Sequence, residues 1–441
     1  MESPPELEGL SGLGGGLLDL VMHWPVRLQA DASRVVVRPF HIPIDSKRGQ
    51  ISRPRRIVEC VLEMDEATAE RELANVLKDF EARHWQTRAV FMTRYAQISS
   101  ALELDDAAIP SVKRQLIGAF FCHEYSYAAA AIMNPSIVRH PDQSGLSKGS
   151  SRIVMSMRTV GEGHISSIAF REGILSPGTR FELAPEPPFA TAADSAAELA
   201  NGAIEVHRHK DSTLSGTVIF PMTTAQSKGL EDLRLVEFTH DDGSTEWLGT
   251  YTAYNGEAIR SELIRTRDFR TFELCPMGGP AARNKGMALF PRKIGGCYTM
   301  VGRQDGENLY LIRSHSLTHW GEGDLLMRPK FPWEMVQIGN CGSPIELDEG
   351  WLLLTHGVGA MRKYSIGAVL LDKEHPDRIL ARTPVPLISA AAEDREGYVP
   401  NVVYTCGAVK HGELLFMPYG VADSSVGFAF VPIKDLLQAM V

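Results

Sequence analysis

The sequence predicts a fold that is all-β over most of its length and helical near its beginning. From Ala131 onward, short apolar runs alternate with turn residues, and no helical segment between them is long enough for a parallel doubly wound sheet. Between residues 65 and 120, apolar residues recur instead at the three-to-four-residue spacing of helices. With 441 residues, of which 44% are hydrophobic, the chain can bury a substantial core.

Residues 1–30 contain five closely spaced glycines and two early prolines, a composition that resists regular structure, so we expect a flexible leader. Residues 33–43 predict a short strand. Three helices should follow, over residues 65–82, 84–100 and 107–120. Together these elements form a predicted N-terminal extension, residues 31–130. One interpretation is that this extension serves packing or oligomerisation, in which case a homo-oligomer would form through the helices. The other is that it forms one wall of the active site.

Short apolar runs predict the strands of the remaining part, residues 131–441. These runs are residues 152–158, 217–220, 247–252, 287–290, 309–312, 351–354, 369–371, 414–417 and 428–431. About 300 residues of such strands fit either a pair of sandwiches or a propeller, in which five blades would take roughly 50–60 residues each. No repeat signature decides between these two architectures.

Charge and composition exclude several classes of function. The net charge of −9 predicts no nucleic-acid partner, and no segment predicts a membrane span or a secretory signal. The six cysteines are widely spaced, with no CxxC pair, so we expect reduced thiols and a cytoplasmic location. Walker, GxSxG and metal-ligand spacings do not occur, which disfavours nucleotide-binding, serine-hydrolase and metal-dependent chemistry.

One segment combines carboxylates with an arginine next to a predicted strand. In residues 227–234, Glu231, Asp232 and Arg234 follow a turn glycine and precede an apolar run. A motif of this kind is common in solvated turns that carry a weak surface ion pair. Other polar residues also interrupt apolar runs, as they would if loops converged on one pocket. With Asp232, these residues are Asn134, Arg158, Lys285, Arg303, His356 and Asp423.

Five motifs occur in order along the chain. They are Asn-Pro-Ser at 134–136, Gly-Leu-Glu-Asp-Leu-Arg at 229–234, Phe-Pro-Arg-Lys-Ile at 290–294, Gly-Trp-Leu-Leu-Leu-Thr-His-Gly-Val at 350–358 and Tyr-Gly-Val-Ala-Asp at 419–423. This set resembles glycoside hydrolase family 130, the β-mannoside phosphorylases and β-1,2-mannosidases, over residues 131–435. The resemblance implies a five-bladed β-propeller whose central pocket holds a terminal β-linked mannose, with inversion at the anomeric carbon. The predicted fold class is therefore all-β, a five-bladed β-propeller with an N-terminal helical extension.

The same resemblance implies a role for Asp232, which matches the aspartate of the family's Gly-x-Glu-Asp-x-Arg pattern. It would be the proton donor, acting in the phosphorylases through a sugar hydroxyl, although Leu233 stands here where proline is usual. An acid at the leaving oxygen is also what cleavage of a glycosidic bond requires. Beside Glu231 in a closed funnel, Asp232 could have a raised pKa. Arg234 could either contact the sugar or act as a structural partner of the carboxylates.

The nucleophile would be phosphate, which requires cations, or water, which requires a carboxylate base. Where family phosphorylases often carry lysine and histidine, this sequence has Glu346 and Gly302. Residues 161–168 also resemble the β-1,2-mannosidase branch. We therefore predict Glu307 and Glu346 as the residues that hold and deprotonate water. Alternatively, Glu346 is an exposed carboxylate at a strand edge and Glu307 caps a turn.

Several side chains could supply the directional hydrogen bonds that a sugar requires. They are Asn134, Arg158, His164, Glu231, Arg234, Lys285, Arg303, His356, Tyr364 and Asp423. Asp423 matches the aspartate of the family's Tyr-Gly-x-x-Asp pattern, which contacts the mannosyl unit. A buried histidine such as His356 is more often structural. No metal or cofactor is expected, and inorganic phosphate would be a co-substrate only in a phosphorylase.

The sequence thus predicts an inverting glycosidase that removes terminal β-linked mannose from a small oligosaccharide, in particular an exo-β-1,2-mannosidase. The first alternative is a phosphorylase that releases mannose 1-phosphate. The second is a non-catalytic sugar-binding propeller, which would need no proton donor.

Overall fold

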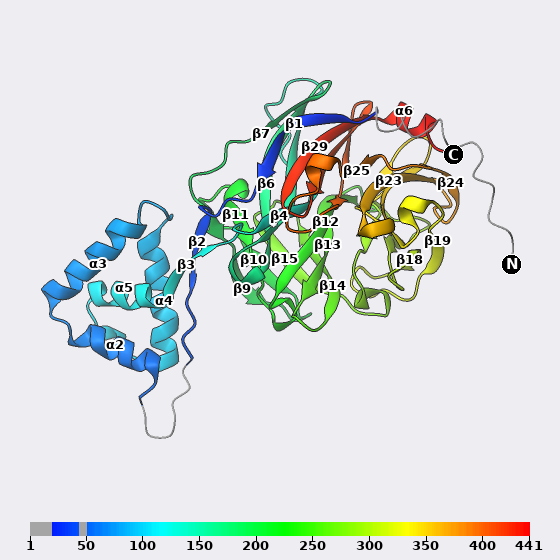
Figure 1. The fold of residues 1–441 in the computed structure, drawn as a ribbon. Coiled ribbons are helices and arrows are strands. Elements are labelled where there is room, and N and C mark those ends of the chain that lie inside the picture. The colour runs from blue at the N-terminus through cyan, green and yellow to red at the C-terminus, as the bar shows by residue number, and fades with distance from the viewer. Residues whose placement is uncertain (1–19, 44–50) are drawn as a thin grey trace.

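The computed structural model describes residues 20–43 and 51–441, and Figure 1 shows a group of helices beside a larger β-rich part. The predicted helices are confirmed as α3, α4 and α5, whereas α2 is an additional helix. Its signal in the sequence was Pro54 in the first turn, followed at helical spacing by the buried Val58 and Val61. The helices are α2 (Arg53–Glu63), α3 (Glu66–Phe80), α4 (Thr87–Leu102) and α5 (Ser111–Phe120).

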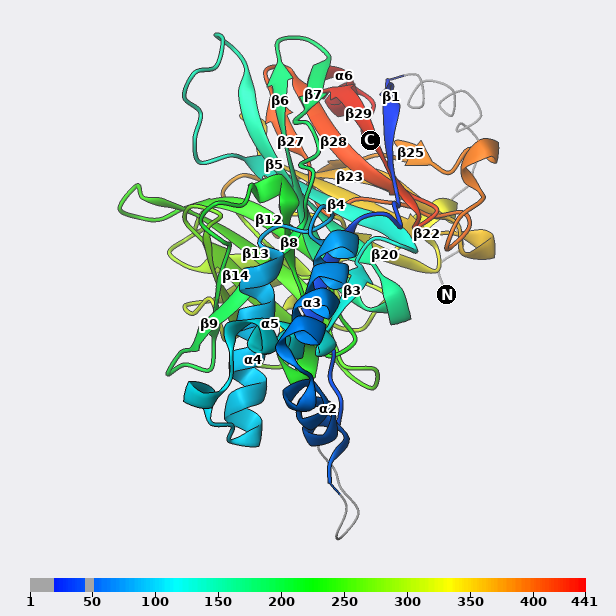
Figure 2. The same ribbon diagram turned by 90° about the vertical axis from the view of Figure 1, so that its left-hand side faces the viewer.

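A two-stranded sheet connects the helices to the rest of the molecule. The predicted strand over residues 33–43 appears as β2 (Val35–Pro39), which pairs with β3 (Cys122–Ser126). Helices α2 to α5 are therefore all inserted between two paired strands, and Figure 2 shows them grouped to one side of the sheets. Among the described residues, no helix is long and apolar enough to cross a membrane.

The largest sheet has twelve strands in two mainly antiparallel parts. These parts meet at one parallel pair, Ser166 with Gly229, and the short strands β8 and β11 also pair in parallel. The strands are β4 (Ala131–Arg139), β5 (Ser151–Val160), β6 (Ser166–Ser176), β7 (Arg180–Leu183), β8 (Thr191–Ala192), β9 (Asp194–Glu198), β10 (Ile204–His207), β11 (Thr217–Ile219), β12 (Gly229–Thr239), β13 (Thr245–Tyr254), β14 (Ile259–Thr266) and β15 (Thr271–Pro276).

Two further sheets follow in chain order. In the second of them, the central strand β22 (Trp351–Val358) is buried along its whole length, as its nearly continuous apolar sequence indicates. One sheet comprises β16 (Ala288–Leu289), β17 (Tyr298–Gly302), β18 (Leu309–Ser314) and β19 (Asp324–Met327). The other comprises β20 (Gln337–Asn340), β21 (Ile345–Glu346), β22 (Trp351–Val358), β23 (Tyr364–Leu371), β24 (Ile379–Arg382) and β25 (Ile388–Ser389).

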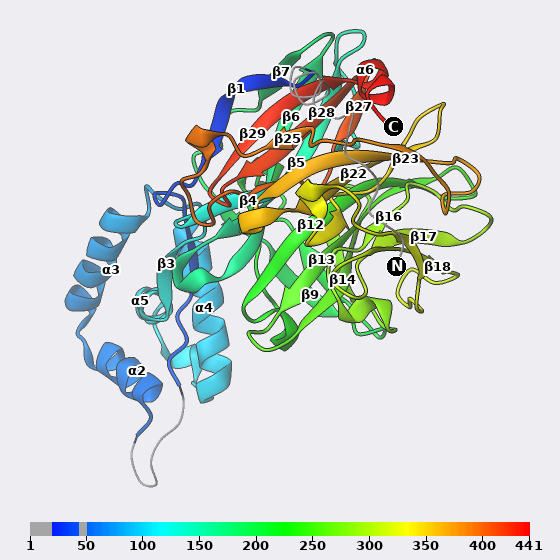
Figure 3. The same ribbon diagram turned by 45° about the vertical axis from the view of Figure 1, so that its right-hand side comes forward.

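The last sheet unites the two ends of the described chain. It comprises β26 (Val403–Tyr404), β27 (Val409–His411), β28 (Leu414–Val421), β29 (Ser425–Pro432) and β1 (Met22–Gln29), and the short helix α6 (Ile433–Gln438) follows it. Strand β1 pairs antiparallel with β29, and Figure 3 shows the two side by side. The prediction of a flexible leader through residue 30 is therefore wrong for β1, while residues 1–19 lie outside the described residues.

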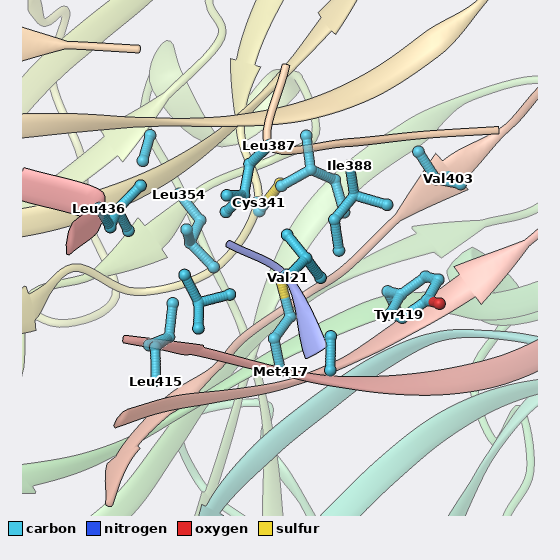
Figure 4. Packing of buried hydrophobic residues seen from close by; sticks show 14 of the residues in the cluster. Val21, Cys341, Leu354, Leu387, Ile388, Val403, Leu415, Met417, Tyr419 and Leu436 are labelled. Atoms are coloured by element: carbon cyan, nitrogen blue, oxygen red, sulfur yellow. The ribbon is translucent and has the colours of Figure 1, made fainter. Parts of the chain in front are cut away.

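A hydrophobic cluster holds this last sheet against its neighbour. Val21, just before β1, packs there with Leu354 of β22, Met417 of β28 and Leu436 of α6, as Figure 4 shows. The burial of these side chains gives the pairing of β1 a hydrophobic driving force.

The predicted β-rich class is confirmed, because each of the apolar runs named above coincides with a strand. Within the described part of the chain, the sheets are open and none closes on itself. The five-bladed arrangement stays a prediction.

Candidate active site

Two strands carry a β-bulge at a residue in the left-handed backbone region. Asn134 in β4 has φ 49° and Asp232 in β12 has φ 55°, and strand pairing shifts register at both positions. Asparagine and aspartate adopt this conformation more readily than other non-glycine residues. A bulge also redirects a side chain out of the regular alternation. Here the two redirected side chains meet, because Asn134 Nδ2 donates a hydrogen bond to Asp232 Oδ1.

Arg158 of β5 joins this pair to a second carboxylate. Its Nη2 lies 2.7 Å from Glu231 Oε1, and its Nη1 lies 3.4 Å from Asp232 Oδ1. Its Nε donates to the Ser166 hydroxyl at 2.9 Å, which orients the guanidinium group. Four of the predicted site residues, Asn134, Arg158, Glu231 and Asp232, are therefore linked by direct contacts.

Arg234 is a structural partner in this arrangement. It is 2% exposed and donates to the backbone carbonyls of Asp232 and Cys341 at 2.7 and 2.8 Å. Its Nη2 donates to the Tyr404 hydroxyl at 2.7 Å. These bonds tie β12 to the segments around Cys341 and Tyr404. Of the two interpretations of Arg234, the geometry favours the structural one.

The pKa values of the carboxyl groups are shifted in opposite directions. Burial opposes ionisation of Asp232, but the charges of Arg158, Arg234 and Lys285 outweigh burial and hold its pKa below the usual range. Burial and the neighbouring Asp232 raise the pKa of Asp423 to about 6. Burial also raises the pKa of Glu231, against the opposing charge of Arg158. The raised pKa predicted for Asp232 is therefore wrong, and the raised values belong to Glu231 and Asp423 instead.

Asp423 comes from the tight turn between β28 and β29. It has φ 48°, and its pKa responds to Asp232, Arg158, Arg362 and Lys285. Asp423 therefore belongs to the same electrostatic cluster as Asp232. We call Asn134, Arg158, Glu231, Asp232, Lys285 and Asp423 the carboxylate cluster.

His356 and Arg303 both lie close to Gly339, and the charge of Asp232 acts on His356. His356 of β22 is 1% exposed, stacks on Tyr364 at 5.9 Å between ring centroids, and meets the Tyr404 ring edge-on at 4.8 Å. Burial, Arg303 and Arg234 lower its pKa, so the imidazole is neutral at pH 7. His356 Nδ1 and Arg303 Nε are buried without a hydrogen-bond partner among the described residues. Both atoms could bind a polar ligand.

His164 is at an exposed position. It lies in a short turn with φ 58°, and its Nδ1 is 3.2 Å from the hydroxyl of Tyr398, which is itself 49% exposed. The structure does not bring it to the carboxylate cluster. Tyr398, Tyr404 and Ser166 are the partners that sequence reasoning missed, because no local motif marks them.

Glu346 lies away from Asp232, contrary to its predicted role as a base. It forms two hydrogen bonds with Arg292, at 3.0 and 2.9 Å, and lies opposite Trp351 in the strand register. His356, on which the charge of Asp232 acts, is five residues beyond Trp351 along β22. Five strand residues correspond to a separation of about 17 Å. The correct interpretation is the alternative one, a carboxylate at a strand edge that is held by an ion pair.

Glu307 is also outside the carboxylate cluster. Its side chain is exposed in the turn before β18. Asp305 caps this turn, because its carboxylate accepts hydrogen bonds from the backbone N–H groups of Glu307 and Asn308 at 2.9 and 2.8 Å. The prediction that Glu307 holds the nucleophilic water is therefore not supported by its position.

The charge arrangement suits a polyhydroxylated or anionic ligand. Across residues 20–43 and 51–441, no group of three or more His, Cys, Asp or Glu side chains could hold a metal ion. Two carboxylates of the cluster, Glu231 and Asp232, are paired with Arg158.

Comparison with known proteins gives a family match and several relatives. A model of glycoside hydrolase family 130, described as β-1,4-mannooligosaccharide phosphorylase, matches residues 195–441. A 1,2-β-oligomannan phosphorylase of Thermoanaerobacter sp. is 35% identical over 155 residues, 35% of this chain and 52% of that protein. A β-1,2-mannobiose phosphorylase of Listeria innocua is 30% identical over 231 residues, 50% of this chain and 63% of that protein. The chain thus matches less than two thirds of either relative.

Solved structures share the fold at low sequence identity. The Listeria innocua β-1,2-mannobiose phosphorylase, in complex with β-1,2-mannobiose, superposes with a TM-score of 0.50 and 21% identity, over 70% of this chain and 92% of that one. A second structure has a TM-score of 0.51 and 20% identity, over 70% and 87% of the two chains. It is described with the finding that this family of mannoside phosphorylases contains glycoside hydrolases that target β-1,2 mannosidic linkages in Candida mannan.

Proposed function

The chain belongs to glycoside hydrolase family 130, and from this membership we propose that it is an inverting β-mannoside phosphorylase. It transfers a terminal β-linked mannosyl unit to inorganic phosphate and releases mannose 1-phosphate. The bond between the anomeric carbon and the glycosidic oxygen breaks, a bond to a phosphate oxygen forms, and the leaving oxygen takes up a proton. This choice reverses the order of the two catalytic alternatives that the sequence left open, since the relatives named above are phosphorylases.

The observation that carries the proposal is that cations act on Asp232 and on the neighbouring His356. Arg158 and Lys285 lower the pKa of Asp232 and Arg303 lowers that of His356, whereas Glu307 and Glu346 lie outside this site. Phosphate needs charged donors, and guanidinium groups bind it with good geometry. Arg303 contributes a buried Nε that has no partner in the described part of the chain.

Proton transfer follows from the charges that surround Asp232. In the free protein these cations keep Asp232 ionised, which is unsuited to an acid that donates directly. A phosphate bound nearby would share the same cations, and its negative charge would raise the pKa of Asp232. Asp232 would then pass a proton to the leaving oxygen through a hydroxyl of the mannosyl unit.

The five-bladed arrangement is part of this proposal. Five antiparallel groups would be the blades, namely β4–β7, β12–β15, β16–β19, β20–β24 and β26–β29 with β1. Pairing of β1 with β29 would join the ends of the ring. All six cysteines are free thiols, which supports a reducing, cytoplasmic location.

A hydrolase that releases free mannose is the second candidate. One observation favours it: Glu231 and Asp423 are carboxyl groups inside the cluster with raised pKa values, and either could serve as a base for water.

Product analysis by NMR tests both candidates. The protein is incubated with β-1,2-mannobiose, with and without inorganic phosphate. We expect α-mannose 1-phosphate, formed only with phosphate, and a loss of about 10²–10⁴-fold in kcat for Asp232→Asn. The exposed Asp241→Asn is the matched control and should retain full activity. Free mannose formed without phosphate would overturn the phosphorylase in favour of the hydrolase, and absence of turnover on β-mannosides would favour a sugar-binding protein.

A further inference from the structure

Two hairpin turns in different sheets have the same backbone conformation. They are residues 161–165, between β5 and β6, and residues 359–363, between β22 and β23. In each turn the backbone N–H of the first residue, a glycine, donates to the carbonyl of the fifth, at 3.1 and 3.0 Å. The third and fourth residues are left-handed, with φ of 70° and 58° in one turn and 57° and 54° in the other. The fourth residue, His164 or Arg362, has an exposed side chain with nitrogen donors.

Each of these turns follows a strand that contributes to the candidate active site. Arg158 of β5 and His356 of β22 both lie three residues before the first glycine of their turn. His164 and Arg362 therefore occupy equivalent positions, each six residues beyond a residue of the site. Arg362 also acts on the site directly, because its charge opposes the rise in the pKa of Asp423.

Tyr398 joins the first of these turns to Asp423. Its hydroxyl lies 3.2 Å from His164 Nδ1, and the two rings are 6.1 Å apart between centroids. The backbone N–H of the next residue, Val399, donates to the carbonyl of Ala422 at 2.9 Å, immediately before Asp423. The side chain of Tyr398 nevertheless remains 49% exposed. An aromatic ring that is open to solvent therefore lies beside the buried carboxylate cluster.

The second turn is attached to the same segment. The backbone N–H of Tyr364, the first residue after the turn, donates to the carbonyl of Asn401 at 3.0 Å. The guanidinium carbon of Arg362 is 6.0 Å from the centre of the Tyr364 ring. Arg362 forms no hydrogen bond or ion pair with another described residue, so its exposed donors are available to a ligand. We call His164, Arg362 and Tyr398 the rim.

The N-terminal extension fixes the turn that carries His164. The hydroxyl of Tyr125, in β3, donates to the carbonyl of Glu162 at 2.8 Å. A Cβ atom added at Gly161 would lie 2.6 Å from that hydroxyl and 2.5 Å from the carbonyl oxygen of Ser126, so β3 and the turn are in close contact. Tyr125 is itself only 5% exposed. The rim is therefore supported from outside the sheets as well as from within them.

We propose that the rim binds the second sugar of the substrate, the unit that leaves when the terminal mannosyl unit is transferred. The exposed ring of Tyr398 offers an apolar surface to one face of a pyranose ring. Arg362 and His164 offer nitrogen donors to its hydroxyl groups. This inference rests on the proposed function in placing the terminal mannosyl unit in the carboxylate cluster, which the rim borders at Asp423.

Isothermal titration calorimetry with β-1,2-mannobiose and with mannose tests the rim. The full chain carries Asp232→Asn, and phosphate is omitted, so that turnover does not interfere. We expect mannobiose to bind about tenfold or more tightly than mannose. Adding Tyr398→Ala should remove most of this preference, and adding Arg362→Gln should reduce it about fivefold. Neither substitution should change the affinity for mannose.

Two substitutions outside the rim are the matched controls. Phe120→Ala removes a ring on α5 that is 47% exposed, much as Tyr398 is. Arg180→Gln removes an exposed guanidinium group that bonds only to the nearby Pro177 carbonyl. Both should keep the full preference for mannobiose.

Equal affinity for the two sugars before the rim is altered would overturn the proposal, and so would binding of neither sugar. A preference that persists in both Tyr398→Ala and Arg362→Gln would overturn it as well. Arg362 lies on an exposed turn, so Arg362→Gln keeps the test valid if Tyr398→Ala does not fold. A failure of the proposed function is detected separately by the product analysis, because a hydrolase with this rim would show the same preference for mannobiose.

Discussion

At the scale of single residues, strained backbone coincides with the charged site. Asn134, Asp232 and Asp423 all have φ between 48° and 55°, and none is a glycine. Each such conformation costs of order 1 kcal/mol and persists only where surrounding structure imposes it. Their convergence in one cluster indicates that the fold bears this cost to place polar side chains.

Asp423 makes stability depend on pH. Its pKa rises from 3.8 in the unfolded chain to about 6 in the folded protein, which therefore binds more protons between these values. The free energy of unfolding should fall as pH rises through this window. Asp423→Asn removes the effect, so the variant should gain about 1–3 kcal/mol relative to the parent between about pH 4 and pH 7. Urea denaturation across this range measures the difference.

Asp372→Asn is the control for this titration. Hydrogen bonds from the backbone of His375 and Glu374 lower the pKa of Asp372, so its contribution to stability is lost as pH falls. The two variants should therefore show opposite trends. A stability difference between Asp423→Asn and the parent that does not change with pH would contradict the buried position of Asp423.

Arg303 should govern the use of phosphate. Its Nε is buried without a hydrogen-bond partner among the described residues. In a phosphorylase, Arg303→Gln should raise the KM for phosphate about tenfold or more, and it should change the KM for mannobiose less. Initial rates at varied phosphate measure this split. An equal rise in both KM values would show that Arg303 does not act on phosphate selectively.

At the scale of elements, close packing of β20 against β22 positions two site residues. A Cβ atom added at Gly339 would lie 2.7 Å from Arg303 Cδ and closer still to His356 Cε1. No other residue fits at this point without moving both side chains. The position of the site thus depends on a glycine that lies outside all of the ordered sequence motifs.

Gly339→Ala should therefore reduce activity about tenfold or more, since small displacements in a site have large effects on rate. Steady-state kinetics measure the loss. Gly321→Ala is the matched control, because nothing lies within 4 Å of its added Cβ, and it should be neutral. Full activity of Gly339→Ala would mean that Arg303 and His356 tolerate displacement and do not bind the reacting groups.

At the scale of the whole molecule, strand β1 ties the start of the described chain to its last sheet. Trp24 of β1 packs on Phe430 of β29, with ring centroids 6.2 Å apart. Val26 on the same strand is 48% exposed. The pairing places residues from both ends of the described chain in one sheet.

Trp24→Ala should lower the free energy of unfolding by about 1–3 kcal/mol through lost packing. Val26→Ala should change it by less than about 0.5 kcal/mol. Urea denaturation of both variants measures these values. Equal stability of Trp24→Ala and the parent would show that β1 contributes little to holding the last sheet.

Local patterns in the sequence by themselves determined much of the architecture. Apolar runs located the strands, and helical spacing located α3, α4 and α5, because these signals depend on residues close in sequence. Strand β1 and helix α2 were not predicted. For β1 the reason is that its stabilising partner, β29, lies some 400 residues away in the sequence. Ordered motifs pointed to Asp232 and to the family.

Only the tertiary structure decided which carboxylates share a site. Glu307, Glu346 and Glu231 cannot be told apart by residue type. In the structure, however, Glu346 is held by Arg292 at a strand edge and Glu307 is exposed in a turn. The sequence likewise could not set the charge of Asp232, because Arg158 and Lys285 reach it from other segments. Protonation depends on distances between groups that are remote in the chain, and the fold alone determines those distances.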